Sequence, residues 1–181
     1  MTGSGDGTIE TARLRLRPMR DGDVDDLLGV FGDPTVMTAF GVKPFGRVEM
    51  ERWLRRTLDH QERHGYGLFA IILKTSGQLI GDCGLERMEL DGQPETELGY
   101  DVRSDHWGRG LATEAATAVR DHAFATLALP RLVSLIRRGN DASRRVAEKV
   151  GMRLDRNLSR DGTDYWLYAV ARSEVARRLR G

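Results

Sequence analysis

The chain has 181 residues, of which 40% are hydrophobic and 30% are charged. At about 150 residues per domain this length fits one domain, large enough to bury a core without metal or disulfides. The longest apolar run, Leu68–Leu73, is far shorter than the roughly 20 residues needed to span a bilayer. The composition therefore predicts a soluble globular protein without a membrane segment.

The N-terminal residues and the cysteine content predict an intracellular location. Residues 1–9 lack the positive start and the apolar stretch of a signal peptide, so we expect a flexible leader on a cytoplasmic chain. The domain is expected over residues 10–175, with a C-terminal tail over 176–181. The single cysteine, Cys83, excludes an internal disulfide and is more typical of core filling than of a nucleophile.

Charge is balanced over the whole chain, with 28 basic and 27 acidic residues, which argues against binding of nucleic acid through phosphate contacts. Its distribution is uneven. Residues 1–102 have a net charge of −6, and residues 103–160 have a net charge of +6. The basic section suits an anionic ligand and the acidic section a cationic one, although an arginine-rich solvated surface would give the same pattern.

Hydrophobic periodicity and turn residues predict the elements along the chain. In chain order these are a strand at 13–17, helices at 21–31 and 47–64, strands at 68–74, 79–88 and 95–103, a long helix at 112–127, a strand at 132–136, a helix at 142–150, and strands at 152–160 and 163–170. Asp33-Pro34 is expected to end the first helix and Gly65 the second. The order predicts a single α/β (α+β) domain with a mixed sheet.

A glycine-rich loop lies between the strand at 95–103 and the long helix. Gly108 and Gly110 allow close approach of a ligand to the backbone, and the first amides of the helix lack partners within it. This arrangement predicts a phosphate cradle, although a plain glycine-rich connection would have the same sequence. An NADP site is a competing interpretation, but Thr113 replaces the third glycine, and Glu97 and Asp101 interrupt the preceding strand.

The loop sequence Trp107–Ala115 resembles the acetyl-CoA pyrophosphate loop of the GNAT N-acetyltransferases, in the form used by the RimJ/RimL branch. Further motifs agree in order and spacing over nearly the whole chain: Glu10–Pro18 resembles the first strand of that branch, Asp33-Pro34 its helix break, Glu97–Tyr100 its fourth strand, and Asn140–Ser143 with Glu148–Met152 its late helix. Two positions depart from the family. Trp107 stands where many members have Gln or Arg, and Ala147 stands where other branches have a tyrosine that protonates the leaving thiolate.

The resemblance implies the GNAT fold, with a splayed, mostly antiparallel sheet flanked by helices. It places acetyl-CoA, the acetyl donor, where the fourth and fifth strands part. The pyrophosphate would lie on the loop, the pantetheine arm on the fourth strand and Asn140, and the sulfur near Ser143. The cofactor-binding residues implied are Tyr100, Asp101, Val102, Trp107, Gly108, Arg109, Gly110, Leu111, Ala112, Thr113, Asn140 and Ser143.

The chemistry needs a base and a leaving group. Deprotonating a lysine-like amine at pH 7.4 costs ~4 kcal/mol, whereas an α-amino group costs only ~0.5 kcal/mol. We expect Glu97 to be the base, with Glu86 or a water chain as alternatives. A thiolate needs little more than a hydrogen bond to leave, which Ser143 could give, although a serine is also common at a helix start.

We therefore predict an acetyl-CoA-dependent N-acetyltransferase in which a primary amine attacks directly. The acceptor is a protein N-terminus or a small cationic amine or antibiotic, and Phe40, Trp53, Glu97 and Tyr165 are its expected contacts. A CoA-binding sensor without catalysis is the alternative, and NADP binding the third possibility. We expect no metal site, since His60 and His64 have no third ligand, and no nucleic-acid or membrane partner. A homodimer is left open.

Overall fold

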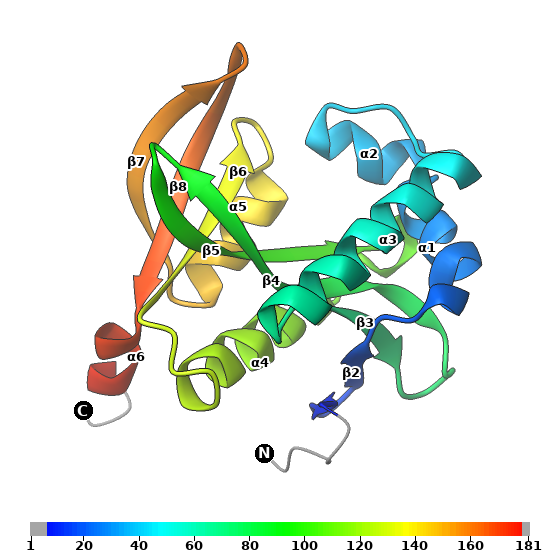
Figure 1. The fold of residues 1–181 in the computed structure, drawn as a ribbon, viewed down its shortest axis with the longest axis horizontal. Helices are drawn as coiled ribbons and strands as arrows, with labels where there is room; N and C mark the ends of the chain where they lie inside the picture. Colours follow the sequence, from blue (N-terminus) through cyan, green and yellow to red (C-terminus); the bar gives the residue numbers. More distant parts are fainter. Residues whose placement is uncertain (1–6, 179–181) are drawn as a thin grey trace.

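An eight-stranded sheet runs through the computed structural model, which describes residues 7–178 of the chain. Its strands are β1 (Ile9–Glu10), β2 (Leu14–Pro18), β3 (Leu68–Leu73), β4 (Leu79–Leu90), β5 (Gln93–Val102), β6 (Arg131–Arg137), β7 (Arg153–Arg160) and β8 (Thr163–Ala171). They lie in the order β1-β2-β3-β4-β5-β6-β8-β7 (Figure 1). The predicted mixed, mostly antiparallel sheet is confirmed.

The sheet splays between β5 and β6. This is its one parallel pair within the described residues, and its register has a single pair of partners, Glu97 and Val133. By contrast, β5 is paired with β4 along its whole length, from Gly81–Val102 to Leu90–Gln93. The backbones of β5 and β6 therefore separate beyond Glu97, toward the carboxyl ends of both strands.

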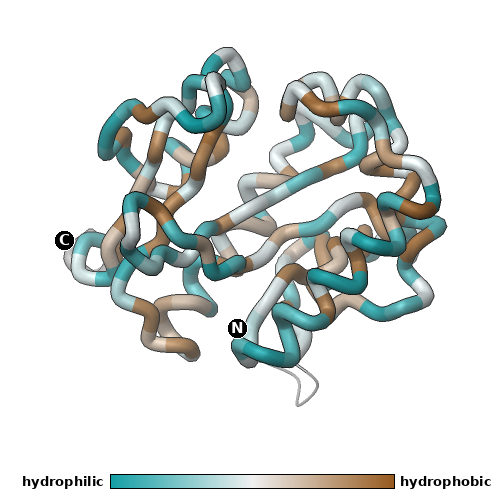
Figure 2. The backbone as a smooth tube through the Cα atoms, turned by 45° about the horizontal axis from the view of Figure 1, so that its top comes forward, coloured by the Kyte–Doolittle hydropathy of each residue, from teal (hydrophilic) through white to brown (hydrophobic). Residues whose placement is uncertain are grey.

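Helices cover both faces of the sheet. They are α1 (Val24–Phe31), α2 (Pro34–Phe40), α3 (Arg47–His64), α4 (Leu111–Ala125), α5 (Asp141–Lys149) and α6 (Arg172–Arg178), with short 3-10 helices at Asp21–Asp23 and Ser104–His106. One buried cluster joins α4 to β4 and β5, and a second joins α1, α2 and α3 to β3. Hydrophilic residues gather at the outer turns of the chain (Figure 2).

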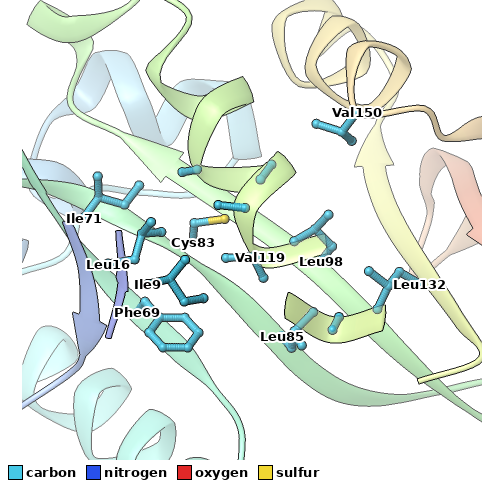
Figure 3. Packing of buried hydrophobic residues seen from close by; sticks show 14 of the residues in the cluster. Ile9, Leu16, Phe69, Ile71, Cys83, Leu85, Leu98, Val119, Leu132 and Val150 are labelled. Carbon is cyan, nitrogen blue, oxygen red and sulfur yellow. The ribbon is translucent and has the colours of Figure 1, made fainter. Parts of the chain in front are cut away.

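Alternation along the strands decides which side chains each layer receives. Cys83 and Leu85 on β4 and Leu98 on β5 point toward α4 and are at most 1% exposed (Figure 3). Each such side chain contributes roughly 1.5–3 kcal/mol by its burial. Cys83 fills the core, as predicted. The residues between these, including Gly84 and Gly99, face the opposite side of the sheet.

Two helical segments differ from the prediction. The helix predicted over 21–31 is a 3-10 turn followed by α1. Asp33-Pro34 does end that helix but also starts α2, because the Asp33 carboxylate accepts a hydrogen bond from the Thr35 amide and Pro34 suits the first helical position. The end of α3 is confirmed, with Gly65 at φ +72°.

The predicted leader and tail fall partly outside the described residues. Within the predicted leader, Thr8 and Ile9 are buried, and Ile9 belongs to β1. The first three residues of the predicted tail belong to α6. No helix in the described part of the chain is long and apolar enough to cross a membrane.

Candidate active site

The glycine-rich loop forms the N-terminus of α4. Gly108 and Gly110 have φ values of +73° and +74°, in the left-handed region that favours glycine. The first backbone bond of the helix joins the Glu114 amide to the Gly110 carbonyl, so the amides of Leu111, Ala112 and Thr113 have no partner within the helix. A Cβ at Gly108 would meet open space. The loop therefore has the free amides, the helix dipole and the room of a phosphate cradle.

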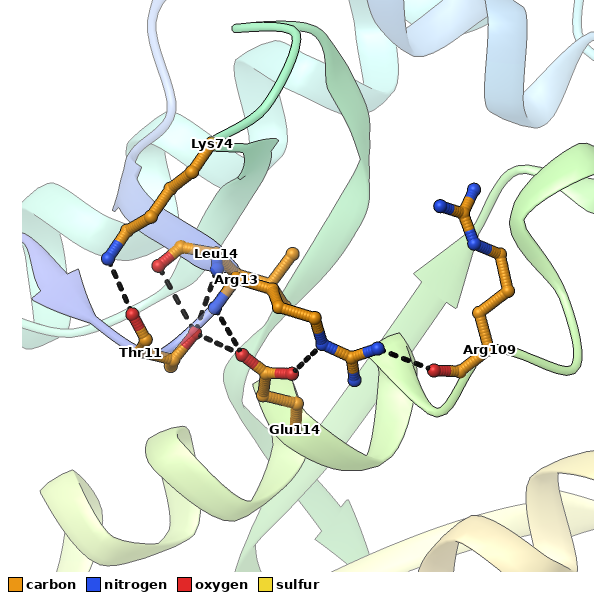
Figure 4. Close-up of polar contacts among 6 residues, drawn as sticks. All are labelled: Thr11, Arg13, Leu14, Lys74, Arg109 and Glu114. Carbon is orange, nitrogen blue, oxygen red and sulfur yellow. Dashed lines mark hydrogen bonds and ion pairs between the residues drawn. The ribbon is translucent and has the colours of Figure 1, made fainter.

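An ion pair from the N-terminal segment holds this loop in place (Figure 4). Glu114 on α4 accepts hydrogen bonds from the Arg13 guanidinium at 2.6 Å, the Arg13 amide at 2.8 Å and the Thr11 hydroxyl at 2.6 Å. The same guanidinium donates to the Arg109 carbonyl at 2.9 Å. Sequence analysis missed this contact, because its partners lie about a hundred residues apart.

A cavity of about 320 Å³ opens in front of the loop, within the size range of ligand sites. Its walls come from α2, the end of β5, the loop, the first turn of α4, and one side of α5 along its length. Of the twelve residues predicted to bind the cofactor, eleven line it: Tyr100, Asp101, Val102, Trp107, Gly108, Gly110, Leu111, Ala112, Thr113, Asn140 and Ser143. Arg109 is not among the lining residues, and its carbonyl is bound by Arg13.

Trp107 braces the loop against β5. Its indole Nε1 donates to the Val102 carbonyl at 2.6 Å, while 45% of the residue stays exposed. The Val102 carbonyl is therefore already bound, which leaves the other main-chain groups near the end of β5 to hold a ligand. The large side chain at this position thus has a structural use that a shorter Gln would not supply in the same way.

The first turn of α5 forms the opposite wall. The Asn140 side chain caps the helix by accepting from the Ser143 amide at 3.1 Å, and the Tyr100 hydroxyl donates to the Ser143 carbonyl at 2.8 Å. Both main-chain groups of Ser143 are thus fixed, and the residue lines the cavity. Ala147 is fully buried one turn further along.

Glu97 lies at the point where the sheet parts. Its Oε1 accepts a hydrogen bond from the Leu135 amide of β6 at 3.1 Å, across the splay. Burial raises the pKa of Glu97 to about 7, against the opposing effect of this hydrogen bond. Glu97 is not among the residues that line the cavity, whose β5 wall begins at Tyr100. A carboxylate with a pKa near neutrality has the properties of a general base.

Other carboxylates share the face of the sheet on which Glu97 lies. Antiparallel register places Glu86 opposite Glu97, and Asp82 opposite Asp101, with Gly84 and Gly99 between the two pairs. Burial raises the pKa of Asp101 to about 7, and it raises the pKa of Asp82 well above its usual range. Sequence analysis missed Asp82 and the Asp101 side chain, although the acidic–glycine–acidic alternation in both strands was a readable signal.

The predicted acceptor contacts do not come together in one place. Phe40 lines the same cavity as the loop, and 39% of it is exposed. Trp53 packs against Phe31, with ring centroids 4.8 Å apart, and lines a different hollow together with Glu86. Tyr165 lies on β8, opposite Arg137 of β6. Only Glu97 of this set lies at the splay.

No group of three His, Cys, Asp or Glu side chains suited to a metal ion exists in the described part of the chain. His60 and His64 stack at the end of α3, with ring centroids 4.5 Å apart. Nε2 of His60 accepts a hydrogen bond from the Arg87 amide at 2.9 Å, so this histidine serves to join α3 to β4.

The fold and the loop define an acetyltransferase, and residues 13–153 match the family model described as "Acetyltransferase (GNAT) domain". The chain belongs to the GNAT family of N-acetyltransferases. It is 36% identical over 152 residues to the uncharacterized protein YkkB of Bacillus subtilis, a match that covers 83% of this chain and 87% of that protein. The doubly wound sheet that the NADP interpretation requires is absent from the described residues, so that interpretation is wrong.

Solved structures agree with this assignment. An acetyltransferase from Agrobacterium tumefaciens is 35% identical, with a TM-score of 0.78 over 90% of this chain and 93% of that one. The ribosomal L7/L12 α-N-protein acetyltransferase RimL, solved with coenzyme A, has a TM-score of 0.75 over 91% of this chain and 97% of that one. At 18% identity this second likeness concerns the fold alone.

Proposed function

We propose that this protein transfers an acetyl group from acetyl-CoA to a primary amine on a cationic acceptor, by direct attack of the amine. The acceptor is a protein N-terminus, as in the RimJ/RimL branch, or a small cationic amine, and the reaction belongs in the cytoplasm. The observation that carries the proposal is one cavity that joins the phosphate cradle, the end of β5 and Ser143, with Glu97 at the adjoining splay.

The residues present suit acetyl-CoA. Free amides at the start of α4 match a pyrophosphate, and the cavity extends from them along Tyr100–Val102 to the first turn of α5. Arg145 and Lys149 also line it and add positive charge for phosphate groups. When bound, acetyl-CoA supplies an activated thioester.

Two side chains take part in the proposed proton transfers and hydrogen bonding. Glu97 accepts a proton from the acceptor ammonium, so that the neutral amine carries the lone pair that attacks. Its pKa of about 7 keeps a large fraction ionised at neutral pH. Main-chain amides at the end of β5 polarise the acyl oxygen, and the Ser143 hydroxyl donates a hydrogen bond to the leaving sulfur.

Ser143→Ala is expected to lower kcat by up to about tenfold, the worth of one ordinary hydrogen bond. The two main-chain contacts of residue 143 survive the change, so the KM for acetyl-CoA and the pH dependence of kcat should stay close to those of the wild type. Steady-state kinetics by thiol release measures both. Ser159→Ala, at an exposed position of β7, is the matched control. An unchanged kcat in Ser143→Ala would remove this serine from the chemistry.

The acceptor class is tested by a panel of amines at two ionic strengths. We expect kcat/KM to be higher for polycationic acceptors than for neutral-bodied amines and to fall with added salt, because screening over about 10 Å at 0.1 M weakens long-range attraction. Acetylated products are identified by mass spectrometry. A best acceptor that is neutral or anionic apart from its amine would contradict the charge argument. If acetyl-CoA binds and no amine accelerates thiol release, the proposed activity itself is wrong.

A further inference from the structure

An acidic site without a counter-charge lies on the β4–β5 face next to Glu97. Asp82 is 1% exposed, and its Oδ1 has no hydrogen-bond partner. It lies directly opposite Asp101 in the antiparallel register, so the two Cβ atoms are roughly 4.5–5.5 Å apart. Neither carboxylate forms a salt bridge within the described residues. An unpaired carboxylate this deeply buried is costly unless a ligand satisfies it.

Two arginines act on the other end of this face. Burial raises the pKa of Glu86 and of Glu97, and Arg56 and Arg160 respectively oppose this effect. Burial and neighbouring carboxylates raise the pKa values of Asp82 and Asp101, and no arginine among the described residues opposes them. The Asp82–Asp101 pair is therefore the part of this face that lacks positive charge.

The space above Gly99, on the β5 side of the two acidic pairs, is open. Gly99 lies between Glu97 and Asp101 on β5, and a Cβ placed on it would meet nothing within 4 Å. Its register partner, Gly84, is covered instead: a Cβ there would clash with the Gly67 carbonyl oxygen, so the opening lies on the β5 side. The distance from Gly99 to Asp101 along the strand is two residues, roughly 6.8 Å, which a three- or four-carbon diamine can bridge.

We propose that Asp82 and Asp101 bind a second ammonium group of the acceptor, and that the acceptor is a small aliphatic diamine or polyamine. This inference rests on the proposed function, because the first amine lies over Gly99, where Glu97 accepts its proton. A compact diamine brings two positive charges without the peptide groups of a protein N-terminus, which would need hydrogen-bond partners of their own at a buried site. The second ammonium also lowers the pKa of the first and so reduces the cost of its deprotonation.

The test compares 1,4-diaminobutane with n-butylamine, which has the same chain and lacks the second amine. At pH 8 the wild-type kcat/KM is expected to be roughly ten- to a hundredfold higher for the diamine, since hydrogen bonds between charged groups are the strong ones. Effects on acetyl-CoA binding or on the thioester are common to both acceptors and cancel in this ratio.

Asp82→Asn and Asp101→Asn should each bring the ratio close to one. Glu89→Gln removes the same charge from an exposed position on β4 and should keep the wild-type ratio. Circular dichroism establishes that each variant is folded. Calorimetric titration of 1,4-diaminobutane into the CoA-loaded protein gives a second readout, with affinity expected in the wild type and lost in Asp82→Asn.

The outcomes separate this inference from the proposed function. If butylamine and the diamine are acetylated equally well, or if both asparagine variants keep the wild-type ratio, the second ammonium site is wrong while the acetyltransferase proposal stands. Preference for a basic peptide over every diamine would likewise overturn the site's assignment to a small acceptor. Absence of any amine-dependent thiol release would overturn the proposed function instead.

Discussion

With n-butylamine, which has no second ammonium for Asp101 to bind, Glu97→Gln is expected to lower kcat/KM by about 10²- to 10⁴-fold and to remove the acidic limb of the pH–rate profile. Burial raises the pKa of this carboxyl to about 7, and only its ionised form can accept a proton. Wild-type activity should therefore rise as the pH increases through about 7 and level off above it. Steady-state rates from pH 5.5 to 9 measure the limb directly.

Two matched variants test which carboxyl gives rise to the acidic limb. Glu86→Gln removes the register partner of Glu97 and tests the alternative base, while Asp101→Asn tests the other carboxyl whose pKa is about 7. We expect an acidic limb to remain in both. Retention of the limb in Glu97→Gln, together with its loss in either of the others, would transfer the role of base to that residue. Retention in all three would favour a water chain.

Gly108→Val is expected to weaken CoA binding by about a hundredfold or more, with loss of activity at ordinary acetyl-CoA concentrations. Gly108 has a φ of +73°, which a β-branched residue rarely adopts, so the loop must change shape and its amides lose their common direction. Hydrogen bonds to charged groups contribute about 1.5–3 kcal/mol each, so misplacing one or two of them accounts for the loss. Isothermal titration with CoA gives the affinity.

Gly162→Val is a closely matched control. Gly162 has a φ of +74°, its missing Cβ also faces open space, and it lies in the β7–β8 turn, away from the cavity. The two variants should lose similar stability in thermal unfolding, but only Gly108→Val should lose CoA affinity. If both folded variants bind CoA as tightly as the wild type, the loop does not contribute to cofactor binding.

Much of the fold could be predicted because strong local patterns decide it. The four-residue steps of apolar side chains in α4, the glycine that ends α3, and the apolar run of β3 are properties of short windows of sequence. The cradle could be predicted for the same reason, since Gly108, Gly110 and the helix start are adjacent in the chain. Glu97 could be proposed as the base because the family motif marks its strand.

The remainder depends on register and on distant partners. Asp82 and Asp101 become a pair only when β4 and β5 align, and a shift of one residue would separate them. The start of α2 depends on a hydrogen bond to the Asp33 side chain. In the sequence, Asp33-Pro34 is equally compatible with the end of the preceding helix. Trp53, a predicted acceptor contact, packs against Phe31 and lines a hollow with Glu86, and neither contact could be read from the sequence.

The contacts of Arg13 and Glu114 have a thermodynamic consequence for the N-terminal hairpin of β1 and β2. A ligand held by the α4 loop favours the loop geometry that these contacts maintain, and the hairpin in turn favours the loop geometry that binds the ligand. Such coupling is reciprocal, so the free energy of cofactor binding also opposes local opening of a hairpin about a hundred residues away in the chain. Cofactor binding and the folding of β1 and β2 are thus thermodynamically coupled.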